Sequence, residues 1–364
     1  MNLLFLNQYG PGDPSPTARL LRDLEADLTA QGHHVAVASA STDYRQRPAR
    51  GWRRWGREFL GLLRILRRAT FTSPRPEVVI SFSSPPGLVV LGALVAARHG
   101  ARSIHWALDL YPDLALTLGE LSPGPLARSV AHAMRWAYRR TDRVVTLDAD
   151  MQARLRQKGV ESEIIAPWTP IAEPVTVDAT PAATPFWLYS GNLGRAHEWE
   201  TLLEIQQRVE AQHPTLELVI QGGGAAWREA QAWAAQRGLQ RCRWRDYSRE
   251  ETLLADLLKA RVLVATQRPE TRGLLWPSKL ALLLQLPRPI LWIGPTDSAA
   301  ARSVAATADS AVFPPGSSEA ASAWLLNAVA AEPRHHPENG QLFFQPDQAV
   351  PLAAWRKLVS NCNK

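Results

Sequence analysis

The chain has 364 residues, of which 46% are hydrophobic, and its 41 Lys and Arg outnumber 34 Asp and Glu to give a net charge of +7. This length suits two domains, and the hydrophobic content excludes a disordered polypeptide. A basic surface attracts anions such as nucleotides, phospholipids, nucleic acid or anionic polymers. Two cysteines, Cys242 and Cys362, exclude a disulfide framework and a cysteine-rich zinc site. With neither a secretion signal nor an apolar run of about 18 residues, we expect a cytoplasmic protein.

The first half of the chain alternates short apolar runs with longer helical patterns. The runs are continuously apolar, as in a parallel sheet that is covered on both faces. This rhythm predicts a doubly wound α/β domain over residues 1–166. Strands are expected at residues 3–6, 35–39, 78–81, 103–106 and 144–146, and helices at 16–31, 87–99, 125–140 and 148–157.

A proline-rich stretch at residues 167–185 has few charges and is typical of an extended linker. The β/α rhythm then resumes and predicts a second Rossmann-like domain over residues 186–340. The tail, residues 341–364, is less regular, although residues 351–359 fit a helix that could pack back on the first domain. Strands of the second domain are expected at residues 187–190, 216–221, 242–245, 262–265 and 290–293, and helices at 199–212, 225–237, 250–259 and 279–286.

Two strand-to-helix corners of the second domain combine flexible backbone with a cation. One corner holds Gly191, Asn192, Gly194 and Arg195, and the other holds Ser278 and Lys279. A helix N-terminus exposes unpaired N–H groups, and Arg and Lys add positive charge, so each corner favours a phosphate. The pair of corners predicts a diphosphate ligand. The alternative is that Pro277 and Ser278 simply start a helix.

Two loops of the first domain follow strands, where parallel sheets collect their ligands. The loop after the first strand offers Gly10, Gly12 and Asp13 for backbone approach and hydrogen bonding. The loop after the fourth strand places aromatic rings beside acids, as sugar recognition requires. Asp109 in this loop could orient or deprotonate an attacking hydroxyl. A surface turn with a helix cap remains the alternative. The other candidates of this loop are Trp106, Tyr111 and Asp113.

Residues 45–75 contain ten arginines and a single acid, Glu58. The large apolar side chains recur at helical spacing from Trp52 to Leu66, so the segment predicts an amphipathic helix with a basic opposite face. Tryptophan and arginine favour peripheral contact with an anionic membrane. The apolar stripe could instead pack on the sheet. No nucleic-acid reader motif accompanies the arginines, so no nucleic-acid partner is expected.

Several segments together resemble family-4 glycosyltransferases of the GT-B fold. The similar branch builds bacterial exopolysaccharides, O-antigen and colanic-acid-like polymers. The resemblance covers about residues 1–316 and is most specific in the glycine-asparagine and proline-serine-lysine segments. It is carried by residues 5–11, 13–18, 106–113, 141–147 with Asp150-Met151, 189–197, and Pro277-Ser278-Lys279-Leu280 with Arg288-Pro289.

The resemblance implies two Rossmann-like domains facing a cleft and a retaining, metal-independent transfer that needs no cofactor besides a nucleotide-diphosphate sugar as co-substrate. The N-terminal domain would bind the acceptor, a lipid-linked glycan at the inner face of the cytoplasmic membrane. The C-terminal domain would bind the nucleotide sugar. Arg195 and Lys279 would neutralise the leaving diphosphate, helped by Ser278 and the backbone of residues 191–194. Asp109 would lie near the reacting sugar, and Glu270 would contact it.

The segment after Lys279 departs from the family pattern. Ala281, Leu282 and Pro287 stand where the family commonly has Tyr, Gly and Gly. Two alternatives therefore stay open beside the transferase. One is a nucleotide-sugar epimerase or hydrolase of the same fold, and the other is a non-catalytic nucleotide-sugar-binding protein.

Overall fold

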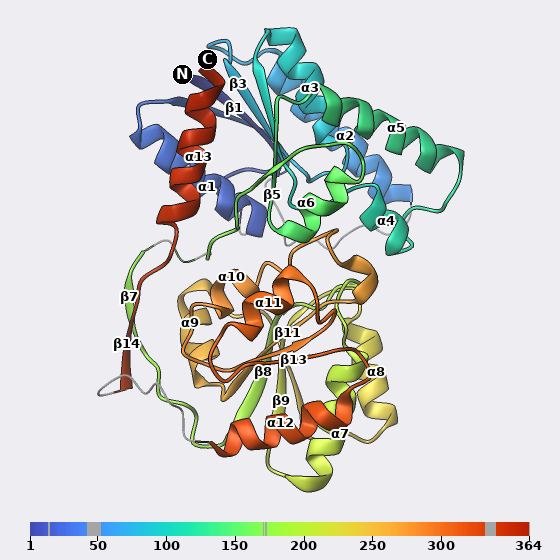
Figure 1. Ribbon diagram of the computed structural model, residues 1–364, viewed down its shortest axis with the longest axis vertical. Coiled ribbons are helices and arrows are strands. Elements are labelled where there is room, and N and C mark those ends of the chain that lie inside the picture. Colours follow the sequence, from blue (N-terminus) through green and yellow to red (C-terminus); the bar gives the residue numbers. More distant parts are fainter. Residues whose placement is uncertain (14, 42–51, 170, 172, 332–339, 364) are drawn as a thin grey trace. The chain divides into compact units, whose positions relative to one another are not determined.

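A computed structural model describes residues 1–13, 15–41, 52–169, 171, 173–331 and 340–363. The chain divides into two compact α/β units (Figure 1). The first unit comprises Met1–Pro170, Gly273–Trp276 and Gln348–Lys364, and the second comprises Ile171–Arg272 and Pro277–Asp347.

The first unit is built on a six-stranded parallel sheet with the order β2-β1-β3-β4-β5-β6. Every residue of β3 is buried, as the continuous apolar runs predict for a sheet covered on both faces. The strands are β1 Asn2–Tyr9, β2 His34–Ser41, β3 Val78–Phe82, β4 Arg102–Trp106, β5 Arg143–Thr146 and β6 Glu163–Ile164.

Helices cover the two faces of this sheet. Successive side chains of a strand point to opposite faces. Accordingly, Leu4 of β1 packs in one cluster with Ile65 of α2, whereas Phe5 packs with Leu24 of α1. Helix α3 lies against both α2 and α5, and α1 lies against α13. The helices are α1 Pro16–Ala30, α2 Trp52–Thr70, α3 Leu88–His99, α4 Asp113–Thr117, α5 Pro125–Arg140, α6 Ala149–Arg156 and α13 Ala349–Ser360.

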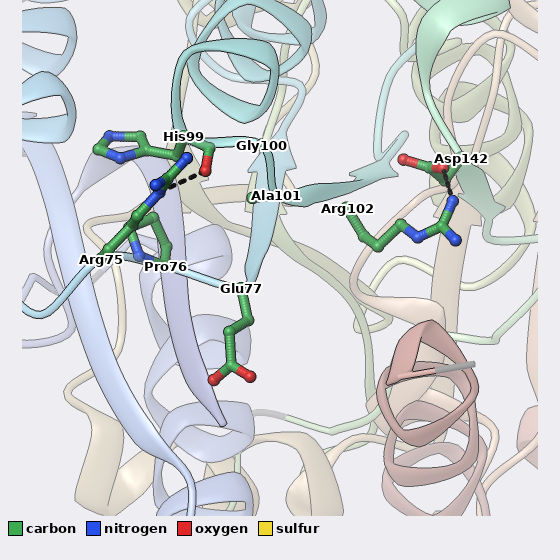
Figure 2. A pocket seen from close by; sticks show the side chains of 8 residues that line it. All are labelled: Arg75, Pro76, Glu77, His99, Gly100, Ala101, Arg102 and Asp142. Carbon is green, nitrogen blue, oxygen red and sulfur yellow. Dashed lines mark hydrogen bonds and ion pairs between the residues drawn. The ribbon is translucent and has the colours of Figure 1, made fainter.

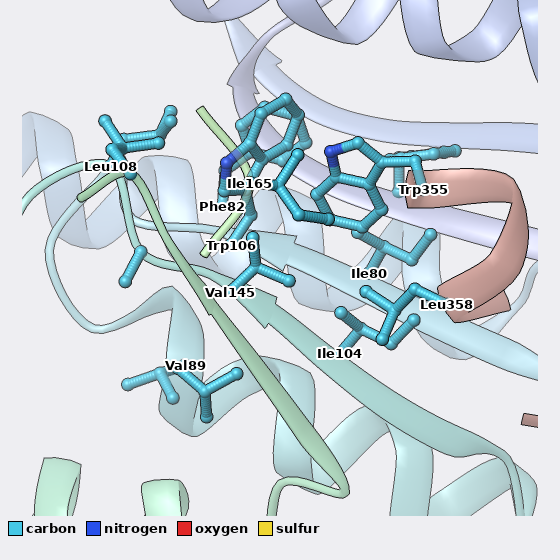
Figure 3. Close-up of a cluster of buried hydrophobic side chains, with 14 of the residues drawn as sticks. Ile80, Phe82, Val89, Ile104, Trp106, Leu108, Val145, Ile165, Trp355 and Leu358 are labelled. Carbon is cyan, nitrogen blue, oxygen red and sulfur yellow. The ribbon is translucent and has the colours of Figure 1, made fainter. Parts of the chain in front are cut away.

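The last helix, α13, completes the core of the first unit with an aromatic cluster (Figure 3). Trp355 is fully buried, and its ring centroid lies 4.7 Å from that of Trp106. Trp106 also stacks against Phe82 and Trp168, at centroid distances of 5.0 and 5.5 Å. Buried aromatic side chains contribute large apolar areas to a core, so this tail is an integral part of the first unit.

The second unit repeats the design with a parallel sheet in the order β10-β9-β8-β11-β12-β13. Its strands are β8 Phe186–Asn192, β9 Glu217–Gly223, β10 Cys242–Arg245, β11 Val262–Thr266, β12 Ile290–Ile293 and β13 Ala311–Phe313. Its helices are α7 Glu200–Gln212, α8 Trp227–Gln236, α9 Glu250–Lys259, α10 Leu280–Leu283, α11 Ala299–Ala305 and α12 Ser318–Ala330. The prediction of two doubly wound Rossmann-like domains is thus confirmed.

Two details differ from the sequence-based expectations. The helix predicted over residues 279–286 contains a single α-helical turn, α10, and ends before Gln285. Within the predicted linker, residues 175–178 form β7 (Val175–Asp178), which pairs antiparallel with β14 (Gln341–Phe344). Proline-rich sequence is compatible with a strand here because these two strands form a two-stranded sheet of their own, in which each lies at an edge.

Candidate functional site

The carboxyl ends of β8 and β9 in the second unit approach each other as bare backbone. Their pairing includes Gly191 opposite Gly222 and ends at Asn192 opposite Gly223. A Cβ atom on Gly222 would lie 2.1 Å from the carbonyl oxygen of Gly191, and one on Gly224 would lie 2.4 Å from that of Leu193. All three glycines have positive φ angles, of 129°, 138° and 131°. Gly222 and Gly224 require glycine because a Cβ atom would clash with neighbouring backbone; Gly222 is buried, Gly191 half-buried and Gly224 exposed.

Lys279 places its ammonium against this edge. A Cβ atom built on Gly191 would lie 3.6 Å from Lys279 Nζ, and Nζ sits 3.4 Å from the centroid of the Tyr189 ring. Nζ is buried and has no hydrogen-bond partner in the part of the chain that the structure describes. Burial lowers the pKa of Lys279 well below its ordinary value. An ammonium in this state lacks the counter-charge that a buried cation needs.

A histidine that the sequence analysis did not single out lies beside this ammonium. His197 Nδ1 donates to the carbonyl oxygen of Thr266 at 2.8 Å, which assigns the proton to Nδ1 because a carbonyl can only accept. Burial first, and the charge of Lys279 second, lower the pKa of His197 to about 3. The imidazole is therefore neutral. The sequence signal that could have identified His197 is its position at the end of segment 189–197, one of the segments that carry the family resemblance.

The structure shows how the helices at the two predicted phosphate corners begin. Helix α7 begins five residues after Arg195, and acids already occupy its first turn. Glu200 accepts from Arg268 at 2.5 Å, and the carboxylate of Glu198 lies 3.7 Å from the same guanidinium. These carboxylates occupy the position that an anion would take. At the second corner, the helix α10 that follows Lys279 is a single helical turn. The candidate site is instead the glycine edge with Lys279.

The other predicted diphosphate residues belong to the same unit. Asn192 is exposed at the end of β8 and accepts a hydrogen bond at its carbonyl from the Tyr189 hydroxyl, at 3.0 Å. Arg195 and Ser278 are exposed, and Gly194 is half-buried. Glu270 is exposed in a short 3-10 helix, Pro269–Thr271, that follows β11.

Asp109 lies in the loop after β4, at the carboxyl edge of the first sheet. Its backbone N–H donates to the Ser83 hydroxyl at 3.1 Å, and its backbone pairs with Leu275 in an isolated antiparallel bridge. The segment Gly273–Trp276, which joins the first unit from far along the chain, thus holds this loop. Burial raises the pKa of the Asp109 carboxyl to about 6. Such a carboxyl changes its charge close to neutral pH.

One predicted sugar-binding residue of the loop after β4 is buried in the core, and two others make contacts within the first unit. Trp106 is the last residue of β4 and is fully buried in the aromatic cluster, so the prediction that it stacks on a sugar is wrong. The reason is that β4 extends as far as Trp106, so the side chain lies within the core and not in the loop. Asp113 begins α4 and forms an ion pair with Lys158, and Tyr111 packs partly buried against the core.

The glycine-aspartate loop after β1 lies at the same sheet edge as Asp109. The buried Asp13 accepts from the Ser15 N–H at 2.8 Å, while its own N–H donates to the Gly10 carbonyl at 3.0 Å. Ser15 in turn caps α1 by accepting from the Ala18 N–H. Gly12 is exposed. This loop therefore shapes the start of α1 and leaves the backbone of Gly12 open.

A hollow elsewhere in the first unit contains none of these residues (Figure 2). It lies at the amino ends of β3 and β4, the sheet edge opposite to Asp109. Its cations already have partners: Arg75 donates to the His99 carbonyl at 2.5 Å, and Arg102 pairs with Asp142 at 2.9 Å. We therefore do not assign a ligand to it. No group of His, Cys, Asp and Glu suited to a metal ion occurs among the described residues.

Comparison with known proteins identifies the first unit. Residues 17–168 match the family described as "Glycosyl transferase 4-like domain". The chain is also 28% identical, over 221 residues, to the putative colanic acid biosynthesis glycosyl transferase WcaI of Escherichia coli K12. That match covers 57% of this chain and 54%, about half, of the relative. The resemblance to the exopolysaccharide branch of family 4 is confirmed.

Solved structures share the architecture of both units. The lipopolysaccharide outer core galactosyltransferase WaaB is 13% identical with a TM-score of 0.58, and 92% of each chain is covered. Anabaena Alr3699/HepE, crystallised with UDP-glucose, is 14% identical with a TM-score of 0.59, and covers 91% of this chain and 90% of its own. These likenesses show that the chain has the GT-B fold.

Proposed function

We propose that the protein transfers a sugar from a nucleotide-diphosphate sugar to a lipid-linked glycan acceptor. The observation that carries this proposal is the buried, unpartnered ammonium of Lys279 at the glycine edge of β8 and β9. Burying an isolated charge costs several kcal/mol in real proteins, and the ring of Tyr189 offsets on the order of 2 kcal/mol. A diphosphate would supply the missing counter-charge.

The glycine edge suits the same ligand. Gly191 has no side chain of its own, and the Lys279 side chain lies beside it, so a phosphate bound by this ammonium would lie next to the backbone of Gly191. In this proposal Lys279 neutralises the leaving diphosphate, with Ser278 and the Arg195 guanidinium contributing donors from the adjoining loops. Fixed cations and donors would then do what a metal ion does in other transferases, so we propose a metal-independent reaction that uses no further cofactor. The UDP-glucose bound to Alr3699/HepE supports a nucleotide sugar as donor.

The first unit supplies the proposed acceptor side. Asp109 has a pKa of about 6, so it is mostly ionised at neutral pH and can accept a hydrogen bond from the attacking hydroxyl. Glu270 of the second unit would contact the transferred sugar. The similarity to a colanic acid biosynthesis enzyme supports a surface polysaccharide as the acceptor class. We further propose retention of configuration, as the family resemblance implies, with a hexose as the transferred sugar.

We place this reaction at the inner face of the cytoplasmic membrane. In the described ranges, no helix is both long and apolar enough to cross a bilayer. The amphipathic segment predicted to touch anionic lipid over residues 45–75 includes α2, whose Phe59 and Leu63 side chains are exposed. Residues 45–51 and the side chains of Trp52 and Trp55 lie outside the described part.

The test combines binding with turnover. Calorimetry with UDP, GDP, ADP and dTDP should find a nucleoside diphosphate that binds wild-type protein and binds Lys279→Met much more weakly. Incubation of the matching nucleotide sugar with bacterial membrane lipid should then yield a glycosylated lipid, and NMR of the product gives its anomeric configuration. Absence of binding to every nucleotide would refute the proposal. Conversion of the nucleotide sugar without any acceptor would favour the epimerase or hydrolase alternative instead.

A further inference from the structure

The exposed apolar side chains of the protein gather on one layer of helices. Eight of the thirteen large apolar side chains that are exposed among the described residues belong to α2, the turn after it, α3 or α5. We call α2, α3 and α5 the three-helix layer, because α3 packs against both of the others on one side of the first sheet (Figure 1). The eight are Phe59, Leu60, Leu63, Leu66, Phe71, Leu94, Leu126 and Trp136.

Helix α2 shows that this exposure is not incomplete core packing. Ile65 and Ala69 are fully buried on the sheet side, where a Cβ atom on Gly61 would lie 3.2 Å from that of Ala40. The opposite side of the helix leaves Phe59 61% exposed and Leu63 45% exposed. The helix therefore has one apolar side for the sheet and a second for something else. The apolar stripe predicted from sequence divides between the two.

Helix α5 repeats this pattern with sequence unrelated to α2. Met134 and Ala137 are buried, whereas Leu126 is 69% and Trp136 is 37% exposed. The guanidinium of Arg140 lies 5.1 Å from the centre of the Trp136 ring. Aromatic side chains next to arginine are typical of the membrane interface, where an amphipathic ring and a cation meet the lipid headgroups.

The charge of the layer is strongly basic. Glu58 is the only acid in residues 52–70, 88–99 and 125–140. The same stretches carry exposed arginines on every helix. Those with exposed side chains are Arg64, Arg67, Arg68, Arg98, Arg128, Arg135, Arg139 and Arg140. A surface that combines apolar side chains with many exposed arginines is complementary to an anionic bilayer, and it would repel a partner of its own kind.

We propose that the whole three-helix layer, and not α2 alone, docks on an anionic lipid bilayer. This inference rests on the proposed function, because it explains how a lipid-linked acceptor reaches the enzyme. α2 and α3 each follow a strand of the parallel sheet, and α5 follows β4 and the short helix α4. The connections into the layer therefore leave the carboxyl edge of the sheet, where Asp109 lies, so a docked layer holds this edge beside the membrane.

Vesicle flotation with purified protein tests the inference on α5, the helix that sequence did not implicate. Phosphatidylcholine vesicles with phosphatidylglycerol should bind the protein, and pure phosphatidylcholine should not. Each arginine near an anionic surface contributes about 1 kcal/mol, which corresponds to roughly fivefold in partition, so Arg135→Gln with Arg139→Gln should weaken binding about 30-fold. Arg228→Gln with Arg241→Gln removes the same charge from exposed positions of the second unit and should change binding less than about twofold.

A second pair, Leu126→Ser with Trp136→Ser, should reduce the binding that persists at high salt, because apolar insertion is not screened. Unchanged vesicle binding in both α5 variants, with loss in a Phe59→Ser and Leu63→Ser variant, would restrict docking to α2 and overturn the inference. Equal loss in the second-unit control would overturn it too, as would self-association of wild-type protein that the α5 variants abolish. Nucleoside diphosphate affinity, measured on the same samples, reports separately on the proposed function and on folding.

Discussion

Replacing Lys279 with methionine should move ligand affinity and stability in opposite directions. Methionine has a similar length and keeps the contact with Tyr189 and Gly191, but it removes the ammonium that lies buried without a partner. If this ammonium is retained to bind a diphosphate, the variant should bind the ligand poorly and fold more stably. A lysine that served the fold would give the reverse result for stability.

The magnitudes follow from the environment of the ammonium. A hydrogen bond to a charged group contributes about 1.5–3 kcal/mol, so the variant should bind a nucleoside diphosphate roughly 10- to 150-fold more weakly. Desolvation of the unpaired cation costs a few kcal/mol, and the cation–π contact with Tyr189 returns up to about 2 kcal/mol. The net gain in unfolding free energy is about 1 kcal/mol, or roughly 2–4 °C in Tm.

The pH dependence provides an independent check. Burial lowers the pKa of Lys279 in the folded, ligand-free protein, so the unfolded chain binds the extra proton in the window between this lowered pKa and about 10.4. Stability of the free protein should therefore rise with pH across that window. A bound diphosphate raises the pKa again, so binding takes up a proton and affinity falls as pH rises there. Lys279→Met should remove both slopes.

Isothermal titration calorimetry in buffers of different ionisation enthalpy measures the proton uptake, and thermal denaturation measures stability. Lys259→Met is the matched control, because Lys259 is exposed on α9 of the same unit and should change neither quantity appreciably. The reasoning is refuted if Lys279→Met keeps wild-type affinity, or if it lowers the Tm while the control does not.

Three further predictions concern other residues. Turnover of wild-type protein should rise with pH through about 6 as Asp109 ionises, and Asp109→Asn should lose turnover and this pH step while keeping diphosphate affinity in calorimetry. The buried guanidinium of Arg288 donates to four backbone carbonyls, so Arg288→Met should lower the unfolding free energy by about 3 kcal/mol in a denaturant titration; an unchanged midpoint would contradict this. Gly222→Ala should prevent or severely destabilise folding through its clash with Gly191, whereas Gly238→Ala, with positive φ but open space, should cost only about 1 kcal/mol by circular dichroism melts.

The sequence predicted which residues belong to the candidate site but not how the structure positions them. Lys279 and Gly191 were both singled out as neighbours of a strand end. Phosphate binding by a pair of helix N-termini stays a prediction, but the sequence did not show that α10 has a single turn or that Glu198 and Glu200 occupy the start of α7. Helix length and the partners of a carboxylate depend on tertiary packing, so they cannot be predicted from a local sequence pattern.

Exposure was a second limit. Trp106 and Trp136 are the same residue type near helices and strands of the same unit, yet one lies in the core and the other faces outward. The stripe of α2 illustrates the same limit, because helical spacing shows which side chains share a face but not what covers that face. Similarly, Arg288 lies in a segment that resembles a family motif, and the structure gives it four backbone carbonyls as partners.

Local sequence determined the class of fold and the family. Continuous apolar runs alternating with amphipathic helices permit few arrangements other than parallel sheets covered on both faces. Short motifs such as Pro277-Ser278-Lys279 carry the family resemblance and can be read without the fold. Tertiary structure alone decided that Lys279 Nζ is buried without a hydrogen-bond partner among the described residues, that Asp109 is held by a segment from far along the chain, and that three helices share one basic apolar surface. Burial and charge pairing are set by neighbours that are distant in sequence, so they emerge only when the chain is folded.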